Sequence, residues 1–214
     1  RDSLEPALSR RPFEVRKKAF SFAGKSLCKK KDIEQVHIAL AYPSLPREHR
    51  LMDAALVGNT VLGGGMSSRL FQKVREQMGL AYTVYSYISS FTEGGMLTVY
   101  AGVNPANVER AREAVLETIR GFCRDKFTKE EFARGKEQLK SSVILAQENT
   151  ASQMIAYAKY MLYNDAILDL EKRVRDIDAM TMEDCEEALS LNFDENKMAA
   201  AVVGKIDRPL PLQD

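Results

Sequence analysis

The order in which strand-like and helix-like patterns follow one another is the feature that most constrains the fold. Residues 35–42 alternate apolar and polar side chains, and residues 81–91 and 95–103 alternate on either side of a glycine-containing turn, as the strands of a hairpin do. Several helical patterns follow, and residues 198–203 form a short apolar run typical of a buried strand. Helices and strands do not alternate regularly, which argues against a doubly wound parallel sheet. The order predicts an α+β two-layer sandwich: a mostly antiparallel sheet with helices on one face.

Local signals predict where the elements begin and end. Residues 15–28 have a strand-like pattern, and Pro43 and Pro46 are expected to end the strand at 35–42. The first expected helix is Arg50–Leu62, and the second is capped by Ser67 and stopped by Gly79. Asn104 and Pro105 are expected to open the third helix, and a Thr128–Glu131 capping box opens the fourth, which runs to about Gln147. Three more helices are expected at about 150–163, 166–177 and 181–190. Residues 1–14 are expected to be an extended arm or inter-domain linker, and residues 15–214 a single domain.

Cysteine and charge narrow the function classes. The three cysteines, Cys28, Cys123 and Cys185, are far apart and odd in number, which disfavours a disulfide framework and favours a reducing, intracellular compartment.

Residues 1–31 hold ten Lys and Arg against three acidic residues, so the net charge of +1 is unevenly placed. A basic arm can attract nucleic acid, but no nucleic-acid-binding motif accompanies it. No apolar run approaches the length of a membrane span.

The histidines and glycines show no motif of metal or phosphate chemistry. His37 and His49 are twelve residues apart, and the chain contains no H-x-x-E-H. Gly63, Gly64 and Gly65 precede a helix, so their amides could contact an anion, but they follow a helix instead of the strand of a P-loop. A flexible connection between helices is the simpler interpretation of the three glycines.

Arg75 and Tyr82 are the candidate site residues. Arg75 lies in the last turn of the expected helix, Gly79 turns the chain back, and Tyr82 starts the next strand. A guanidinium and a phenol presented to one spot would suit a peptide carbonyl, or negative charge that develops on it. In the competing interpretation, Arg75 complements the carboxyl end of its helix and Tyr82 covers the core with its hydroxyl in water.

The segment Leu62–Ser86, L-G-G-G-M-S-S-R-L-F…V-R-E…G-L-A-Y…Y-S, resembles the non-zinc half of the pitrilysin, insulinase and mitochondrial-processing-peptidase family of inverzincin peptidases. The resemblance runs from about Gln35 to Gly204 and is most specific in that segment. It implies a domain of the metallopeptidase-half type that closes with a similar half around a peptide. By the stretch R-E-Q-M-G-L-A-Y, it implies that Tyr82 donates a hydrogen bond to the scissile carbonyl and that Arg75 anchors the substrate backbone. Gly63, Gly64 and Gly65 fall near a substrate-contacting glycine-rich loop of that family, in shorter form.

The resemblance also implies what this chain lacks. The family's zinc is held by H-x-x-E-H and a downstream Glu of the other half, so zinc is expected in a missing N-terminal half and this chain alone is expected to be inactive. The expected whole is a cytoplasmic zinc metalloendopeptidase, or one of the mitochondrial matrix, that cleaves unfolded peptides or presequences. Its expected partners are that N-terminal half and the peptide, with a homodimer as a further alternative and no nucleic acid or membrane.

Two other functions stay open. The first alternative is a non-catalytic interaction or peptide-binding subunit of the same superfamily, like the processing-peptidase alpha subunit or a bc1 core protein. An in-frame H-x-x-E-H upstream of Arg1 would favour the enzyme half, and a start codon just before Arg1 would favour the subunit. A nucleic-acid-binding domain that uses residues 1–31 is the weakest alternative.

Overall fold

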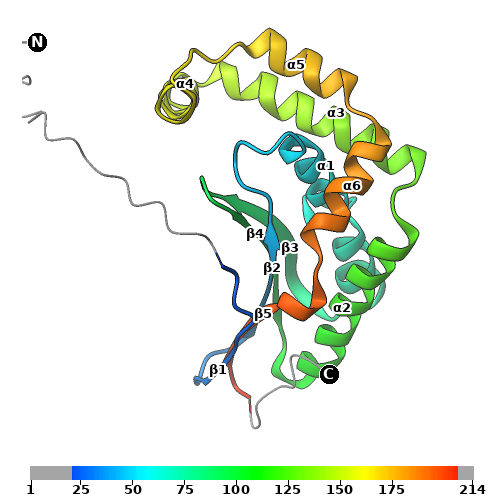
Figure 1. Cartoon of the computed structure of the whole chain (residues 1–214). Helices are drawn as coiled ribbons and strands as arrows, with labels where there is room; N and C mark the ends of the chain where they lie inside the picture. The colour runs from blue at the N-terminus through cyan, green and yellow to red at the C-terminus, as the bar shows by residue number, and fades with distance from the viewer. Residues whose placement is uncertain (1–20, 207–214) are drawn as a thin grey trace, which may run out of the picture.

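The chain folds into an open five-stranded sheet with helices packed on one side (Figure 1). The computed structural model describes residues 21–206, so the expected arm at 1–14 lies outside the described residues. The strands are β1 (Ser26–Lys30), β2 (Val36–Ser44), β3 (Ala81–Ser90), β4 (Gly95–Val103) and β5 (Ala199–Gly204), in the order β1-β5-β2-β4-β3. Among the strands of the described residues, only the β1–β5 pair is parallel, which confirms the mostly antiparallel sheet.

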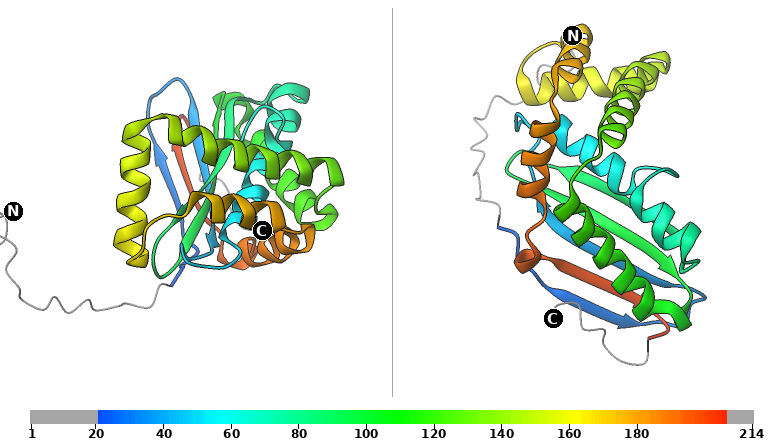
Figure 2. Two further views of the ribbon diagram at one scale, coloured as in Figure 1. Left: turned by 90° about the horizontal axis from the view of Figure 1, so that it is seen from above. Right: turned by 90° about the vertical axis from the view of Figure 1, so that its right-hand side faces the viewer.

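The helical layer follows the predicted order. The helices are α1 (Met52–Gly63), a π-helical segment η1 (Phe71–Gln77), α2 (Val108–Asp125), α3 (Lys129–Leu145), α4 (Thr150–Asn164), α5 (Leu170–Ala179) and α6 (Met182–Asn192), with short 3₁₀ turns η2 (Pro105–Asn107), η3 (Ala146–Glu148) and η4 (Glu195–Lys197). Figure 2 shows α2 and α6 lying across the sheet, while α4 and α5 stand at one end of the molecule. In the part of the chain that the structure describes, no helix combines the length and apolarity needed to cross a membrane.

Alternation and helical spacing build one core between the layers. Val36, Ile38, Leu40 and Tyr42 of β2 are all buried on the helix side, as their alternation predicted. The predicted apolar stripe of α2 is buried as well; its members are Val108, Ala111, Val115, Ile119 and Phe122. The sheet therefore uses one face for the core, and within residues 21–206 no helix packs on the other face (Figure 1).

Capping chemistry sets most helix starts where the sequence predicted them. The side chain of Asn104 accepts a hydrogen bond from the Ala106 amide at 2.9 Å, which starts η2 and then α2. The capping box at α3 is formed, since the Glu131 amide donates to Thr128 Oγ1 and the Thr128 amide donates to Glu131 Oε2. Gly79 has φ of +60°, which confirms the left-handed stop after η1.

Two boundary predictions were wrong, and a third is tested only in part. Of the strand predicted at 15–28, residues 15–20 lie outside the described residues; residues 21–25 are not in a strand, and β1 begins at Ser26, where it aligns with Ala200 of β5. Pro43 does not end β2; it pairs with Met96 of β4, and the side where it lacks an amide is unpaired because the β5 ladder stops at Ala41. The α5 helix starts at Leu170 instead of 166, because Asp169 caps it by accepting from the Lys172 amide.

Glu131 also ties the start of α3 to the segment before η1. Its carboxylate accepts from Arg69 at 2.6 and 2.7 Å, and Arg69 also donates to the Lys126 carbonyl at 2.6 Å. Burial raises the pKa of Glu131, but hydrogen bonds from Arg69 and the Thr128 amide outweigh it and hold the pKa below its ordinary value. The ionised carboxylate is therefore favoured in the folded state.

The depressed pKa of Glu131 gives stability a defined pH dependence. Its contribution is fully present above the ordinary carboxyl pKa and is lost as the pH falls through the lower folded-state pKa. We expect Glu131→Gln to lower the thermal unfolding midpoint at pH 7, with a difference from wild type that shrinks below about pH 4. Glu171→Gln is the control, because that side chain is 90% exposed. A difference that stays constant with pH would contradict this assignment.

Candidate functional site

Arg75 projects from a helix that is wider than an α-helix. The Met78 amide donates to the Lys73 carbonyl five residues back at 3.1 Å, which is the hydrogen-bond spacing of a π-helix. Beyond the end of the helix, the Leu80 amide donates to the Val74 carbonyl six residues back at 3.0 Å. Val74 is buried, whereas Arg75 is exposed. The Arg75 guanidinium lies over the Phe71 ring, 4.8 Å from its centroid, which restricts the side chain without burying its charge. A π-helical turn of this kind is frequent at functional sites.

Tyr82 is exposed because of a bulge at the start of β3. Ala81 pairs with Val103 and Thr83 with Gly102, so Tyr82 is an extra residue between two adjacent ladder positions. Val84 and Ser86, which share its even numbering, point into the core. Simple alternation would bury Tyr82 with them, but the bulge leaves it 56% exposed.

Gly79 connects the two candidate side chains. Its positive φ ends η1 and turns the chain into β3, the edge strand of the sheet, and η1 packs against β3. Both Arg75 and Tyr82 are accessible at this corner of the molecule. Within residues 21–206, the Tyr82 hydroxyl has no hydrogen-bond partner, and no hydrogen bond links it to Arg75. A phenol donor and a guanidinium are thus both available to a bound group.

The three glycines lie beside the same corner. A cavity of about 350 Å³ is lined by Gly63, Gly64, Gly65, Met66, Phe71, Val84, Tyr85 and Ser86. Phe71 therefore lines the cavity and also contacts the Arg75 guanidinium. Gly64 and Gly65 are exposed, but Gly63 is the buried last residue of α1.

Gly63 allows a close approach of α1 to β3. A Cβ at this position would lie 2.5 Å from both the amide nitrogen and Oγ of Ser86. We expect Gly63→Ala to reduce the free energy of unfolding by about 1–3 kcal/mol, because the helix must move off the strand. Gly65→Ala is the matched control, since its Cβ would meet only the Gln138 amide nitrogen, at 3.7 Å. Equal stability of the two variants in urea unfolding would contradict this packing role.

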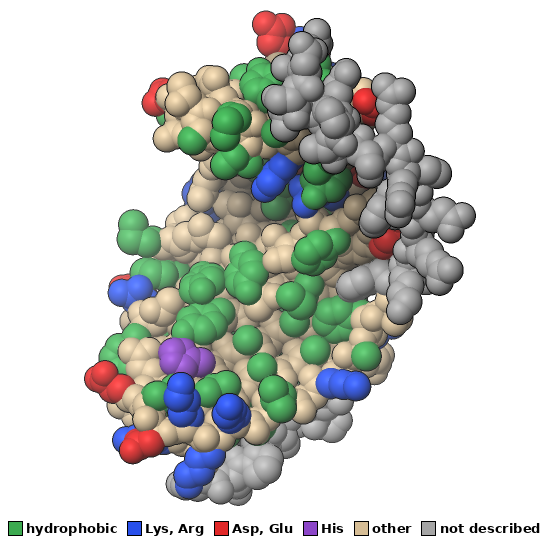
Figure 3. All heavy atoms as spheres, turned by 90° about the vertical axis from the view of Figure 1, so that its left-hand side faces the viewer, with side chains coloured by type: hydrophobic (Ala, Val, Ile, Leu, Met, Phe, Trp, Pro, Cys, Tyr) green, Lys and Arg blue, Asp and Glu red, His purple; other side chains and the backbone are tan. Residues whose placement is uncertain are grey.

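Sequence reasoning did not single out an aromatic cluster on the open face of the sheet. The Tyr85 ring lies 5.1 Å from Tyr100 and 6.1 Å from Tyr87, and His37 Nδ1 is 2.6 Å from Tyr100 Oη. Burial, and then the neighbouring Tyr85, raise the pKa of Tyr100. Figure 3 shows hydrophobic side chains spread over this face. The signal in the sequence was the alternation of tyrosines, but only the register places Tyr100 beside Tyr85.

The described residues contain no cluster of three or more His, Cys, Asp or Glu side chains that could hold a metal ion. The two histidines lie apart and each has another partner. His37 contacts Tyr100, and His49 Nδ1 accepts a hydrogen bond from the Leu51 amide at 3.2 Å. The structure thus assigns both rings to local contacts.

The fold and the site define an open-sheet, two-layer α+β domain with an arginine and a tyrosine exposed at one sheet corner. Comparison with known families gives a match of residues 7–139 to the Peptidase M16 inactive domain. The chain belongs to this family.

Similar proteins agree with that assignment. The chain is 40% identical over 162 residues to "Uncharacterized zinc protease YmxG" of Bacillus subtilis, covering 76% of this chain and 40% of that protein. It is 38% identical over 151 residues to "Uncharacterized zinc protease SCO5738" of Streptomyces coelicolor, covering 71% of this chain and 33% of that protein. Its fold resembles a solved peptidase M16 inactive domain from Pseudomonas fluorescens, with a TM-score of 0.83, 22% identity, and coverage of 99% of this chain and 50% of that one. The chain thus spans less than half the length of these two curated relatives.

Proposed function

We propose that this chain is the substrate-binding half of a zinc metalloendopeptidase that cleaves unfolded peptides or presequences. Arg75 and Tyr82 would enter an active site completed by a zinc-bearing N-terminal half outside these residues. The observation that carries the proposal is the bulge at Tyr82, which exposes a phenol that strand alternation would otherwise bury. Membership of the M16 inactive-domain family and relatives named zinc proteases support it.

The geometry suits recognition of a peptide carbonyl. The Tyr82 hydroxyl has no competing acceptor within the described residues, so it is free to donate to a carbonyl oxygen. Arg75 keeps its charge in solvent while Phe71 holds its stem and plane. Together they would stabilise negative charge that grows on that oxygen during cleavage. A zinc ion held by the other half would supply the activated water.

The cavity beside Gly64 and Gly65 extends the proposed binding surface. Its apolar lining, Met66, Phe71, Val84 and Tyr85, would accept an apolar side chain of the peptide. The exposed backbone of the two glycines would contact the peptide main chain. We further propose that residues 15–214 form one domain, that residues 1–14 link it to the other half, and that the protein is cytoplasmic.

Metal dependence tests the proposed function as a whole. We expect the longer protein to cleave an unfolded peptide, to lose activity on treatment with a chelator, and to regain it when zinc is added back. Residues 1–214 alone should be inactive with or without zinc. Binding of the peptide by a longer protein that neither holds zinc nor cleaves would instead indicate the non-catalytic, peptide-binding subunit.

A further inference from the structure

The open face of the sheet carries almost no charge. Strands β2 to β5 contain no Asp, Glu, Lys or Arg, and His37 is their single histidine. A sheet face that no helix covers usually alternates in polar and charged side chains, because it meets water. By register, this face instead presents small and aromatic residues, namely Ala39, Ala41, Ala199, Ala201, Tyr85, Tyr87 and Tyr100. It is therefore suited to an uncharged ligand.

Thr98 is the unusual residue of this face. Leu97 and Val99 on either side of it are core residues, so alternation directs Thr98 to the open face, opposite Ala41 of β2 and Tyr87 of β3. Its side chain is nevertheless only 5% exposed, and its hydroxyl oxygen is buried without a hydrogen-bond partner in the described residues. A buried hydroxyl in this state costs free energy, and a bound group that supplies the missing hydrogen bond would recover it.

Two tyrosines lie beside Thr98 on the same face. Tyr100 is two residues further along β4, and its hydroxyl oxygen lies 2.6 Å from His37 Nδ1, which restrains the ring. Tyr85 pairs with Tyr100 across the strands, with ring centroids 5.1 Å apart and planes tilted by 35°. A tilted pair of this kind can take a third aromatic ring against it. Tyr85 is also three residues from Tyr82, about 10 Å along β3.

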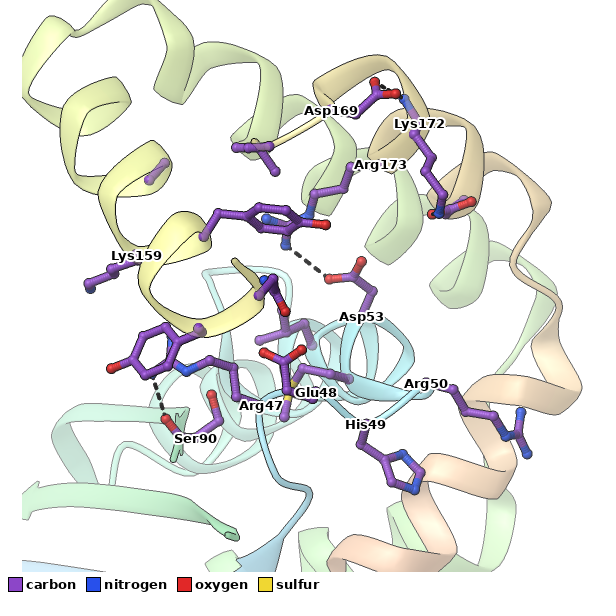
Figure 4. A pocket seen from close by; sticks show the side chains of 18 of the residues that line it. Arg47, Glu48, His49, Arg50, Asp53, Ser90, Lys159, Asp169, Lys172 and Arg173 are labelled. Carbon is purple, nitrogen blue, oxygen red and sulfur yellow. Dashed lines mark hydrogen bonds and ion pairs between the residues drawn. The ribbon is translucent and has the colours of Figure 1, made fainter. Parts of the chain in front are cut away.

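The charged cavity beneath α4 differs from the open face. It has a volume of about 480 Å³ and is bordered by α1, α4, α5 and the segment before α1 (Figure 4). Arg47 lies over the Tyr163 ring at 4.3 Å and donates to the Ser90 carbonyl at 2.8 Å, while Arg173 pairs with Asp53 at 3.0 Å. These charged groups hold α4 and α5 to the body of the domain, so their internal partners explain them without a ligand.

We propose that Thr98, Tyr85 and Tyr100 form a subsite for a tyrosine side chain of the peptide. The inference rests on the proposed function, since it needs a peptide held at Tyr82. The two rings pack against the ring of the bound tyrosine, and the Thr98 hydroxyl forms a hydrogen bond with its phenol. Because the Thr98 oxygen is closed off in the free protein, an exposed neighbouring side chain turns aside on binding, a motion that takes nanoseconds or less.

The position and charge of the subsite define the substrate further. A separation of about 10 Å from Tyr82 corresponds to two or three residues of an extended peptide, so the recognised tyrosine lies that far from the scissile bond. A lysine or arginine at this position is disfavoured, because strands β2 to β5 offer no carboxylate to a desolvated cation. The subsite thus favours uncharged unfolded peptides over basic presequences. A cation stacked on the tyrosine rings is the competing occupant.

Peptide binding tests the subsite. The longer protein is stripped of zinc with a chelator, and fluorescence anisotropy measures the Kd of labelled, otherwise uncharged unfolded peptides with Tyr, Phe, Leu or Lys at one position, varied along the peptide. At one position, we expect Tyr to bind about fivefold more tightly than Phe, and about tenfold or more tightly than Leu or Lys. Equal or tighter binding of Lys, or no preference for Tyr at any position, would overturn the inference.

Thr98→Val separates recognition from a structural role. The change keeps the shape and removes the hydroxyl, so the Kd of the Tyr peptide should rise about fivefold to match that of the Phe peptide. The thermal unfolding midpoint should not fall, because the hydroxyl has no partner in the free protein. Thr83→Val is the matched control, since Thr83 is an exposed residue of the same face, opposite Gly102, and should keep the preference. An unstable or unfolded Thr98→Val protein, or an equal loss of preference in both variants, would overturn the inference.

Restoring zinc distinguishes this inference from the proposed function. Selective binding of the Tyr peptide without any cleavage would support the subsite and reject only the catalytic part of the proposed function. Cleavage of all four peptides with equal kcat/KM and equal Kd would reject only the subsite. Cleavage two or three residues from the preferred tyrosine would support both.

Discussion

Replacement of Tyr82 by Phe in the longer, zinc-bearing protein is expected to lower kcat for peptide cleavage by roughly 10²–10³ with little change in KM. The hydroxyl would act on charge that develops on the carbonyl oxygen, so its loss affects the transition state more than substrate binding. The change should leave folding intact, because the side chain is 56% exposed and its hydroxyl bonds to nothing else in the described chain. Steady-state kinetics and the thermal unfolding midpoint measure the two effects separately.

Tyr87→Phe is the matched control for Tyr82→Phe. Tyr87 lies on the same strand with 43% exposure, and it undergoes the same chemical change. It should keep wild-type kcat, since strand alternation alone explains its exposure. An unchanged kcat in a folded Tyr82→Phe variant would remove Tyr82 from the mechanism. An equal loss in both variants would indicate a general effect of the tyrosine surface.

Replacement of Phe122 by Ala is expected to have the largest effect on stability, a loss of about 3–5 kcal/mol in the free energy of unfolding. Phe122 is fully buried and packs edge-to-face on Phe127, with ring centroids 5.1 Å apart. The Arg69 guanidinium lies 4.8 Å from the Phe122 centroid. Truncation would therefore leave a cavity where α2 meets the loop before α3 and the segment that leads into η1.

Urea unfolding measures this loss. Phe91→Ala removes the same atoms from a hairpin-turn side chain that is 59% exposed, and it should change stability by no more than about 0.5 kcal/mol. Similar losses in the two variants would contradict the assignment of Phe122 to the core. If Phe122→Ala lost much less than about 3 kcal/mol, α2 and the loop before α3 would have relaxed into the space left by the ring.

The candidate site was only partly readable from the sequence. Local rules placed Arg75 in the last turn of its helix and Gly79 at its end, because a glycine stop acts over a few residues. The resemblance led us to expect an accessible Tyr82, but strand alternation contradicts that expectation, because it assigns Tyr82 to the buried side with Val84 and Ser86. The bulge that exposes it depends on how β3 aligns with Val103 and Gly102, some twenty residues away.

Pro43 and the tyrosine cluster show the same limit. A proline was expected to end β2, but it is accommodated because β5 pairs with β2 only as far as Ala41. Tyr85 and Tyr100 contact each other because the β3–β4 register places them opposite one another. Neither outcome is encoded in neighbouring residues, since each depends on which strand lies alongside.

The sequence by itself determined the class of fold, the order of its elements and most helix starts. Those follow from side-chain periodicity and from caps such as Thr128 with Glu131, which act within one turn. Tertiary structure alone decided which strand lies at the edge, that Tyr82 turns outward, that Gly63 lies against Ser86, and that α4 exposes its apolar side. These features arise from contacts between segments far apart in the chain, so no local pattern of residues specifies them.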